Sequence, residues 1–173
     1  MTKHSIAVLS LLCATMSFSG CGRSQSFPPG MPKSYPAAIT IIQDGQGLDG
    51  ASVTLMPLDG STWYASANTD AHGAAVLMTQ GQYPGVVPGR YKILVTKRDT
   101  APSTVVIPDP DIDPAGYSKA LEQANKEVLE SFDLIDPKYA SVDAAPEEIE
   151  IIAGKNEKTI DVGKAVRIKT GRR

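Results

Sequence analysis

The chain has 173 residues, of which 42% are hydrophobic and 21% are charged, a size that suits one folded domain. Seventeen basic and nineteen acidic residues leave a net charge of -2, which argues against nucleic acid as a partner because no field attracts its phosphates. Gly (15) and Pro (13) are frequent, and aromatic residues make up only 6%. This balance favours short strands joined by many turns.

Residues 1–20 have the layout of a secretory signal peptide. Lys3 and His4 precede an apolar stretch over residues 6–16, and small residues follow it. A permanent membrane helix is the alternative, but it needs ~20 apolar residues, far more than this stretch supplies. The pattern therefore predicts an exported protein whose signal is removed.

The residues before Cys21 resemble the lipobox of bacterial lipoproteins, in which the Cys thiol takes a diacylglycerol and becomes the mature N-terminus. Ser19 and Gly20 fit this motif, whereas Phe18 stands where Leu is usual. The alternative is that Cys21 is an ordinary residue beyond a conventional cleavage site. The motif predicts lipid attachment at Cys21 and anchoring to a bacterial membrane.

Cysteine usage favours the lipid. Cys13 leaves with the signal, so Cys21 is the single Cys of the mature chain and has no intramolecular partner. Acylation gives this thiol a use. Gly22, rather than Asp, follows the Cys, which under the proteobacterial sorting rule resembles an outer-membrane address.

A change of pattern near residue 37 marks the expected start of the folded domain. Residues 21–36 are rich in Pro and Gly and show no apolar period, which predicts a flexible tether. The folded domain is expected over 37–170, and 171–173 are a short tail.

Period-two alternation predicts seven strands. They cover residues 38–41, 51–55, 63–68, 74–79, 90–97, 148–151 and 160–162. We expect 63–68 to form a hairpin with 74–79, and 148–151 to form a second hairpin with 160–162. The expected fold is an all-β, seven-stranded antiparallel Greek-key sandwich.

Two glycines stand where turns meet strands. Gly73 ends the turn-forming stretch 69–73, and Gly89 precedes the clearest predicted strand. Glycine adopts positive φ at no steric cost. We therefore predict that Gly73 and Gly89 serve turns and not ligands.

Residues 98–136 form an insertion between the fifth and sixth predicted strands. Asp113 followed by Pro114 fits a helix N-cap with Pro at the first position. Helical spacing predicts one amphipathic helix over about 115–131. Its apolar stripe comprises Tyr117, Leu121, Ala124, Val128 and Phe132. We expect this stripe to dock on the sandwich, in a position where a partner could compete for it.

Turn residues followed by alternating strand patterns occur in residues 47–57, 69–73 and 87–97, and residues 137–140 read Pro-Lys-Tyr-Ala. In their order and spacing these four segments resemble small bacterial lipoproteins, many of them planctomycete, with a carboxypeptidase-regulatory-like, transthyretin-like domain. The pattern departs from the family over 141–147, which lack the Leu expected before the sixth strand. The resemblance implies a seven-stranded prealbumin-like sandwich, and it implies no established activity.

Enzymes on similar folds are a poor match. Hydroxyisourate hydrolases use several His and Arg residues, and intradiol dioxygenases hold iron with two His and two Tyr, whereas the mature chain has only His72. No Gly-x-Ser-x-Gly elbow or phosphate loop occurs. Asp109, Asp111 and Asp113 alternate, but Pro114 occupies the position where a calcium loop needs Gly. We expect no enzyme activity, no metal and no cofactor.

Trp63, Tyr64 and Tyr83 are the only plausible stacking residues for a sugar, although core packing of Trp63 is the simpler interpretation. The main hypothesis is a non-enzymatic, lipid-anchored cell-envelope protein that acts as a binding or assembly module. Its expected contacts are the membrane and another envelope protein, through loops or a sheet edge. The alternative is a carbohydrate-binding module of the starch-binding-like sandwich type.

Overall fold

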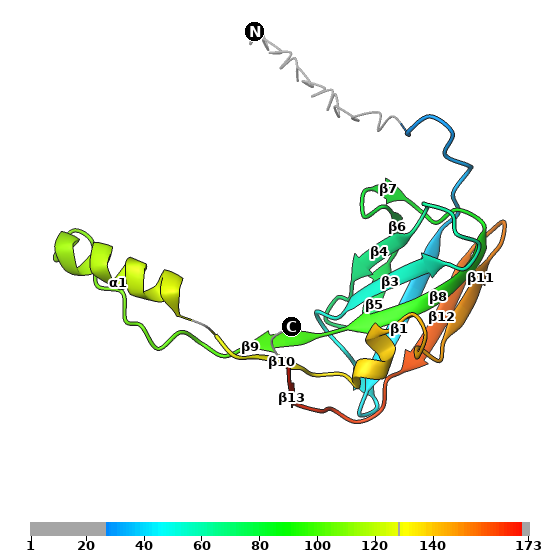
Figure 1. The fold of residues 1–173 in the computed structure, drawn as a ribbon. Helices are drawn as coiled ribbons and strands as arrows, with labels where there is room; N and C mark the ends of the chain where they lie inside the picture. Colours follow the sequence, from blue (N-terminus) through cyan, green and yellow to red (C-terminus); the bar gives the residue numbers. More distant parts are fainter. Residues whose placement is uncertain (1–26, 128, 171–173) are drawn as a thin grey trace, which may run out of the picture.

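The computed structural model describes residues 27–127 and 129–170. The predicted signal peptide, Cys21, Val128 and the tail 171–173 lie outside the described residues. The fold is mainly β, sandwich-like, with one α-helix (Figure 1).

The strands are β1 (Ala37–Gln43), β2 (Gln46–Gly47), β3 (Ser52–Pro57), β4 (Ala65–Asn68), β5 (Ala74–Val76), β6 (Met78–Thr79), β7 (Tyr83–Pro84), β8 (Gly89–Thr96), β9 (Arg98–Thr100), β10 (Ser131–Asp133), β11 (Glu148–Ile151), β12 (Asn156–Asp161) and β13 (Ile168–Lys169). The helices are α1 (Pro114–Lys126) and the 3-10 helix η1 (Pro137–Ala140).

Three sheets form from these strands. A six-stranded sheet has the order β11-β8-β3-β4-β6-β7, and a four-stranded sheet has β12-β1-β2 with β5 also on β1. A three-stranded sheet, β13-β10-β9, lies apart from them. Each of the seven predicted segments overlaps a strand, although 160–162 covers only the end of β12, which begins at Asn156. The prediction of seven strands in one sandwich is nevertheless too low, because strands of two or three residues are too short to show alternation.

Alternate residues of the two larger sheets form the core. The largest fully buried side chains include Ile39, Ile41, Val53, Leu55, Leu77, Tyr91, Ile93, Val95 and Ile151. Each large apolar side chain stabilises the fold by roughly 1.5–3 kcal/mol when it is buried. These positions follow the predicted alternation, so the core side of the strands was readable from the sequence.

The predicted hairpin of 63–68 with 74–79 is only partly correct. β6 pairs with β4, but β5 pairs with β1 in the other sheet. Leu77 lies between β5 and β6 and is fully buried, so the segment crosses the core between the two sheets. A single run of alternating residues therefore serves both sheets.

The second predicted hairpin is wrong. β11 pairs with β8, whereas β12 runs parallel to β1. The buried Asn156 side chain stabilises the connection that passes from β11 in one sheet to β12 in the other. Its Oδ1 accepts from the backbone N–H of Ile152 at 3.0 Å, and its Nδ2 donates to the carbonyls of Ile152, Gly154 and Pro36 at 3.1–3.2 Å. The fold therefore contains a parallel strand pair and is not wholly antiparallel.

Residues 98–136 form the inserted segment, whose residues 98–133 (β9, α1, β10 and the segments between them) are an arm, whereas Ile135 is buried in the core. The inserted segment lies between β8 and β11, as predicted. The helix begins at Pro114 with Asp113 as N-cap, whose Oδ1 accepts from the Gly116 N–H at 2.9 Å. It ends at Lys126 rather than near 131, because Glu127 is extended. Phe132 of the predicted stripe therefore lies in β10.

The expected docking of the helix on the sandwich is wrong. Figure 1 shows α1 well away from both large sheets, joined to them through β9 and β10. Ala120 is the buried residue of this helix. β9 follows β8 almost directly and pairs with β10, so the ribbon that they form carries the helix beyond the end of the sandwich. Among the described residues, no helix is long and apolar enough to span a membrane.

Because α1 lies off the core, its amides should exchange with solvent far faster than those of β8. A helix of this length is marginal without tertiary packing. Hydrogen exchange should give residues 117–126 at least about a hundredfold less protection than residues 91–96, measured on the same sample. Equal protection in the two segments would contradict the undocked arm.

Candidate functional site

Ion pairs at the base of the arm join β9 to β10, and join both to residues 167–169 at β13. Arg98 Nε lies 3.0 Å from Asp133 Oδ1, and so joins β9 to β10. Arg167 Nη1 lies 2.8 Å from Asp99 Oδ2, and its guanidinium stacks over the Phe132 ring at 4.1 Å from the ring centre. Exposed pairs of this kind contribute at most about 1 kcal/mol each. Together they hold the direction in which the arm leaves the sandwich.

An open cleft of about 730 Å³ lies at the base of the arm, between the three-stranded sheet and η1. Its lining residues are Arg98, Ser131, Asp133, Pro137, Ala140, Ser141, Ile168, Lys169 and Thr170. The charged side chains are already paired, Arg98 with Asp133 and Lys169 with Glu130. The cleft is therefore mixed in polarity and belongs to the structure of the arm.

Glu127 fastens Ser103 and Thr104 to the end of the helix. Its Oε1 accepts from the backbone N–H of Thr104 at 3.0 Å and from the Thr104 hydroxyl at 2.7 Å, and the Ser103 hydroxyl donates to Oε2. These hydrogen bonds, with Ser103 first, hold the pKa of Glu127 below its usual value. The arm is thus a built structure with its own internal contacts.

The arm is apolar and acidic at its surface. Val106 is 86% exposed and Ile112 is 83% exposed, and Ile107 is also exposed. Residues 98–136 contain three basic and nine acidic residues, for a net charge of -6. A surface with exposed large aliphatic side chains and strong negative charge is suited to a basic partner with apolar pockets.

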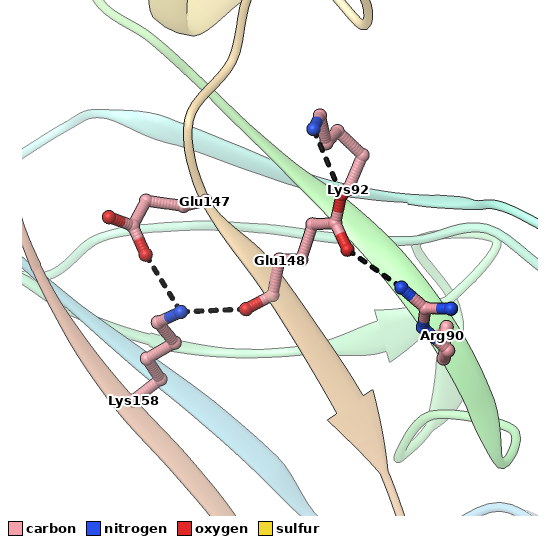
Figure 2. A network of polar contacts seen from close by, with 5 residues as sticks. All are labelled: Arg90, Lys92, Glu147, Glu148 and Lys158. Carbon is pink, nitrogen blue, oxygen red and sulfur yellow. Dashed lines mark hydrogen bonds and ion pairs between the residues drawn. The ribbon is translucent and has the colours of Figure 1, made fainter.

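The edge of β11 is occupied by a lysine from the other sheet (Figure 2). Lys158 Nζ donates to the Glu148 backbone carbonyl at 2.6 Å and lies 2.7 Å from Glu147 Oε2. The Glu148 carboxylate accepts from Lys92 at 3.0 Å and from Arg90 at 3.1 Å, and these two contacts, Lys92 first, lower its pKa. Because this network links the two sheets, it makes the β11 edge less available for pairing with a foreign strand.

The predicted stacking residues come from two parts of the fold. Trp63 and Tyr64 precede β4, and Tyr83 lies in β7. Tyr64 is 41% exposed, whereas Trp63 is half-buried and its carbonyl accepts from the Tyr91 hydroxyl at 3.4 Å. The Tyr83 ring instead contacts Phe27, with 5.8 Å between ring centres. Tyr64 is thus the outward-facing aromatic residue of the Trp63-Tyr64 pair.

The remaining candidate residues serve turns. His72 is exposed, and its backbone N–H donates to Asp70 Oδ1 at 2.9 Å; the bonds from Ala74 and His72 lower the pKa of Asp70. Asp109 accepts from the Asp111 N–H at 2.9 Å. Within 27–127 and 129–170, no group of three or more acidic, His or Cys side chains is placed to hold a metal ion.

One buried titratable group has a clearly changed pKa. Burial, and secondarily the charge of Asp59, raises the pKa of Tyr91 to about 12. Its hydroxyl donates to the Val87 carbonyl at 2.7 Å, so this tyrosine is a satisfied core residue.

Sequence reasoning missed the exposed residues of the arm. The available signals were the consecutive apolar residues 105–107 between prolines and the excess of acidic residues in the insertion. An apolar run without period is equally compatible with a buried segment. Only the placement of the arm distinguishes the two.

Neither a family model nor a curated protein matches the sequence. Distantly similar solved structures include two bacterial proteins. A variant of the major pilin subunit of Bacillus cereus is 15% identical, with 76% of this chain and 30% of that chain covered and a TM-score of 0.40. A candidate adhesin from Bacteroides ovatus is 15% identical, with 78% and 45% covered and a TM-score of 0.34. The chain thus spans less than half of either structure.

Proposed function

We propose that the protein is a non-enzymatic, lipid-anchored module of the bacterial cell envelope that binds another envelope protein through its arm. The observation that carries this proposal is the arm itself, which extends beyond the sandwich with Val106 and Ile112 exposed. Export and the anchor at Cys21, in the outer membrane, are part of the proposal and rest on the sequence motif.

The carboxypeptidase-regulatory-like, transthyretin-like assignment is likewise a proposal. Two of its four matching segments contain β3 and β8, which pair with each other so that Val53 lies opposite Val95. A third contains the turn around His72, and the fourth is η1. The matching segments therefore include the centre of the six-stranded sheet.

The chemistry of the arm favours protein binding. Covering a fully exposed Val or Ile contributes roughly 1.5–3 kcal/mol, and a few such side chains dominate most interfaces. Arg167 and Lys169 offset two of the six excess negative charges of residues 98–136 through Asp99 and Glu130, and the remaining negative charge would steer a basic partner toward the arm and oppose acidic ones. A helix with no sandwich surface to pack on would also be ordered further by a partner groove.

The proposal of a non-enzymatic role is supported by the positions of the perturbed carboxylates. The lowered pKa values of Asp70, Glu127 and Glu148 come from a turn, an arm contact and an inter-sheet ion network. Each shift thus has a structural cause.

Replacing both Val106 and Ile112 by Ser should weaken partner capture at least tenfold without lowering the melting temperature. Each side chain is exposed in the free protein, so its loss removes interface area and leaves the core intact. Crosslinking and pull-down from native envelopes would measure recovery of the captured protein. Since the arm is acidic, recovery should also fall as salt is raised.

Val76→Ser is the matched control, because Val76 is 72% exposed but lies on β5. Undiminished recovery with the double arm variant would contradict the proposal. Saturable glycan binding that is lost in Tyr64→Ala would instead favour the carbohydrate-binding alternative.

A further inference from the structure

We infer that the end of the sandwich opposite the arm rests on the lipid bilayer through exposed apolar side chains on separate loops. We call this surface the anchor-side end and define it by Phe27, Leu58 and Ile152. The inference rests on the proposed lipid at Cys21 and adds an orientation to it. The occupant to which it commits is a bilayer surface.

Backbone register places two of these loops together. Gly89, the first residue of β8, is opposite Ile151, the last residue of β11, so Ile152 lies just beyond the sheet there. The Leu58 N–H donates to the Arg90 carbonyl at 2.9 Å, which places Leu58 beside the start of β8. Both apolar side chains therefore lie at the end where β8 begins.

The segment before β1 is fastened to the same end. Tyr35 and Val86 exchange two backbone hydrogen bonds of 2.8 Å, and Ser34 Oγ donates to the Pro84 carbonyl at 2.7 Å. Asn156 ties the loop after β11 to this segment through the Pro36 carbonyl. The last residues of the predicted tether thus lie against the sandwich.

Phe27 lies beside β7, at the opposite edge of the six-stranded sheet from β11. Its ring contacts Tyr83, and with Met31 and Lys33 it lines a hollow of about 330 Å³. Phe27 remains 53% exposed, Leu58 44% and Ile152 59%. Such aromatic and aliphatic side chains on loop tips are suited to the boundary between headgroups and acyl chains.

The short segment between Cys21 and Phe27 would keep the bilayer close to this end of the sandwich. Cys21 precedes Phe27 by six residues, and a chain spans at most ~3.3–3.6 Å per residue. Acyl chains on Cys21 would therefore enter the membrane within about 20 Å of Phe27. The arm leaves from the other end of β8, eight residues along, which is on the order of 25 Å away (Figure 1).

The charges at this end indicate a neutral contact. Arg90 pairs with Glu148 at 3.1 Å, and Lys155 pairs with Glu157 at 2.6 Å. Lys33 lies over the Tyr35 ring, 5.3 Å from its centre. Because Lys155 has its own carboxylate partner and Arg90 shares Glu148 with Lys92, this end keeps only a small excess of positive charge, so apolar insertion rather than attraction to anionic lipid should hold it on the membrane. The bound sandwich then points its arm away from the bilayer.

Spin labels test the orientation. The acylated protein is reconstituted in phosphatidylcholine vesicles with a label at Lys155→Cys or, as the matched exposed control, at Asp111→Cys on the arm. A water-soluble nickel relaxer should reach the label at 155 at least about threefold less than the label at 111. Adding Leu58→Asp and Ile152→Asp should abolish the difference.

Three results would overturn the inference. Equal nickel access at 155 and 111 in protein that co-floats with vesicles contradicts the orientation alone. Dipolar coupling between labels at 155 on two copies, present without vesicles, assigns this end to a dimer instead. If the protein does not float with the vesicles and its intact mass lacks acyl chains, the lipid anchor is wrong. The proposed orientation is then wrong as well, because it depends on the anchor.

Discussion

Replacing Cys21 by Ser should move the protein from the membrane fraction to the soluble fraction, with at least a hundredfold loss of membrane association. Each buried methylene contributes ~0.8 kcal/mol, so two or three acyl chains hold a protein far more firmly than one myristoyl chain. A serine hydroxyl would not replace the thiol to which we propose the diacylglycerol is attached. Intact mass of the wild-type protein should show cleavage before Cys21 and the added acyl chains.

The other cysteine supplies the control. Cys13 lies in the predicted signal, so Cys13→Ser makes the same chemical change but should leave processing and anchoring unaffected. If the Cys21→Ser protein were cleaved and anchored as before, the lipid proposal would be wrong.

Gly73→Val should lower the free energy of unfolding by at least about 3 kcal/mol. Gly73 has φ +79°, and a Cβ there would lie 2.4 Å from the Ile41 carbonyl oxygen and 2.8 Å from the Leu48 nitrogen. A positive φ costs a branched residue about 1–2 kcal/mol, and backbone atoms that close must shift as well. Thermal unfolding should show a drop of about 10 °C.

Gly50→Val separates the two causes. Gly50 has φ +63°, but no atom lies within 4 Å of its hypothetical Cβ, so this variant should show the conformational cost alone, about 1–2 kcal/mol. A Gly73→Val protein of unchanged stability that lost a binding activity would contradict the structural role and favour a ligand site.

Several local features followed from the sequence. Alternation in residues 90–97 gave both the strand β8 and its buried face, Tyr91, Ile93 and Val95, because side chains of a strand point alternately to its two sides. The helix start was readable because an N-cap carboxylate, Asp113, and a following Pro are chemical requirements of the first turn.

The end of the helix was not readable. The apolar stripe continues at helical spacing to Phe132, yet Glu127 bonds to Ser103 and Thr104, and Phe132 pairs with Asp99 in β9. These partners lie 23 to 33 residues away in the sequence, and periodicity reports only neighbours within a few turns.

The sequence by itself indicated where most of the longer strands lie, which of their sides is apolar, and where the helix begins. Only the tertiary structure decided that β12 runs parallel to β1, that β5 and β6 belong to different sheets, and that the arm stands off the core. The physical reason is that strand alternation and helix capping depend on interactions between residues that are close together in the sequence. Sheet partners and exposed surfaces depend on which distant segments bury each other, and many pairings satisfy the same local pattern.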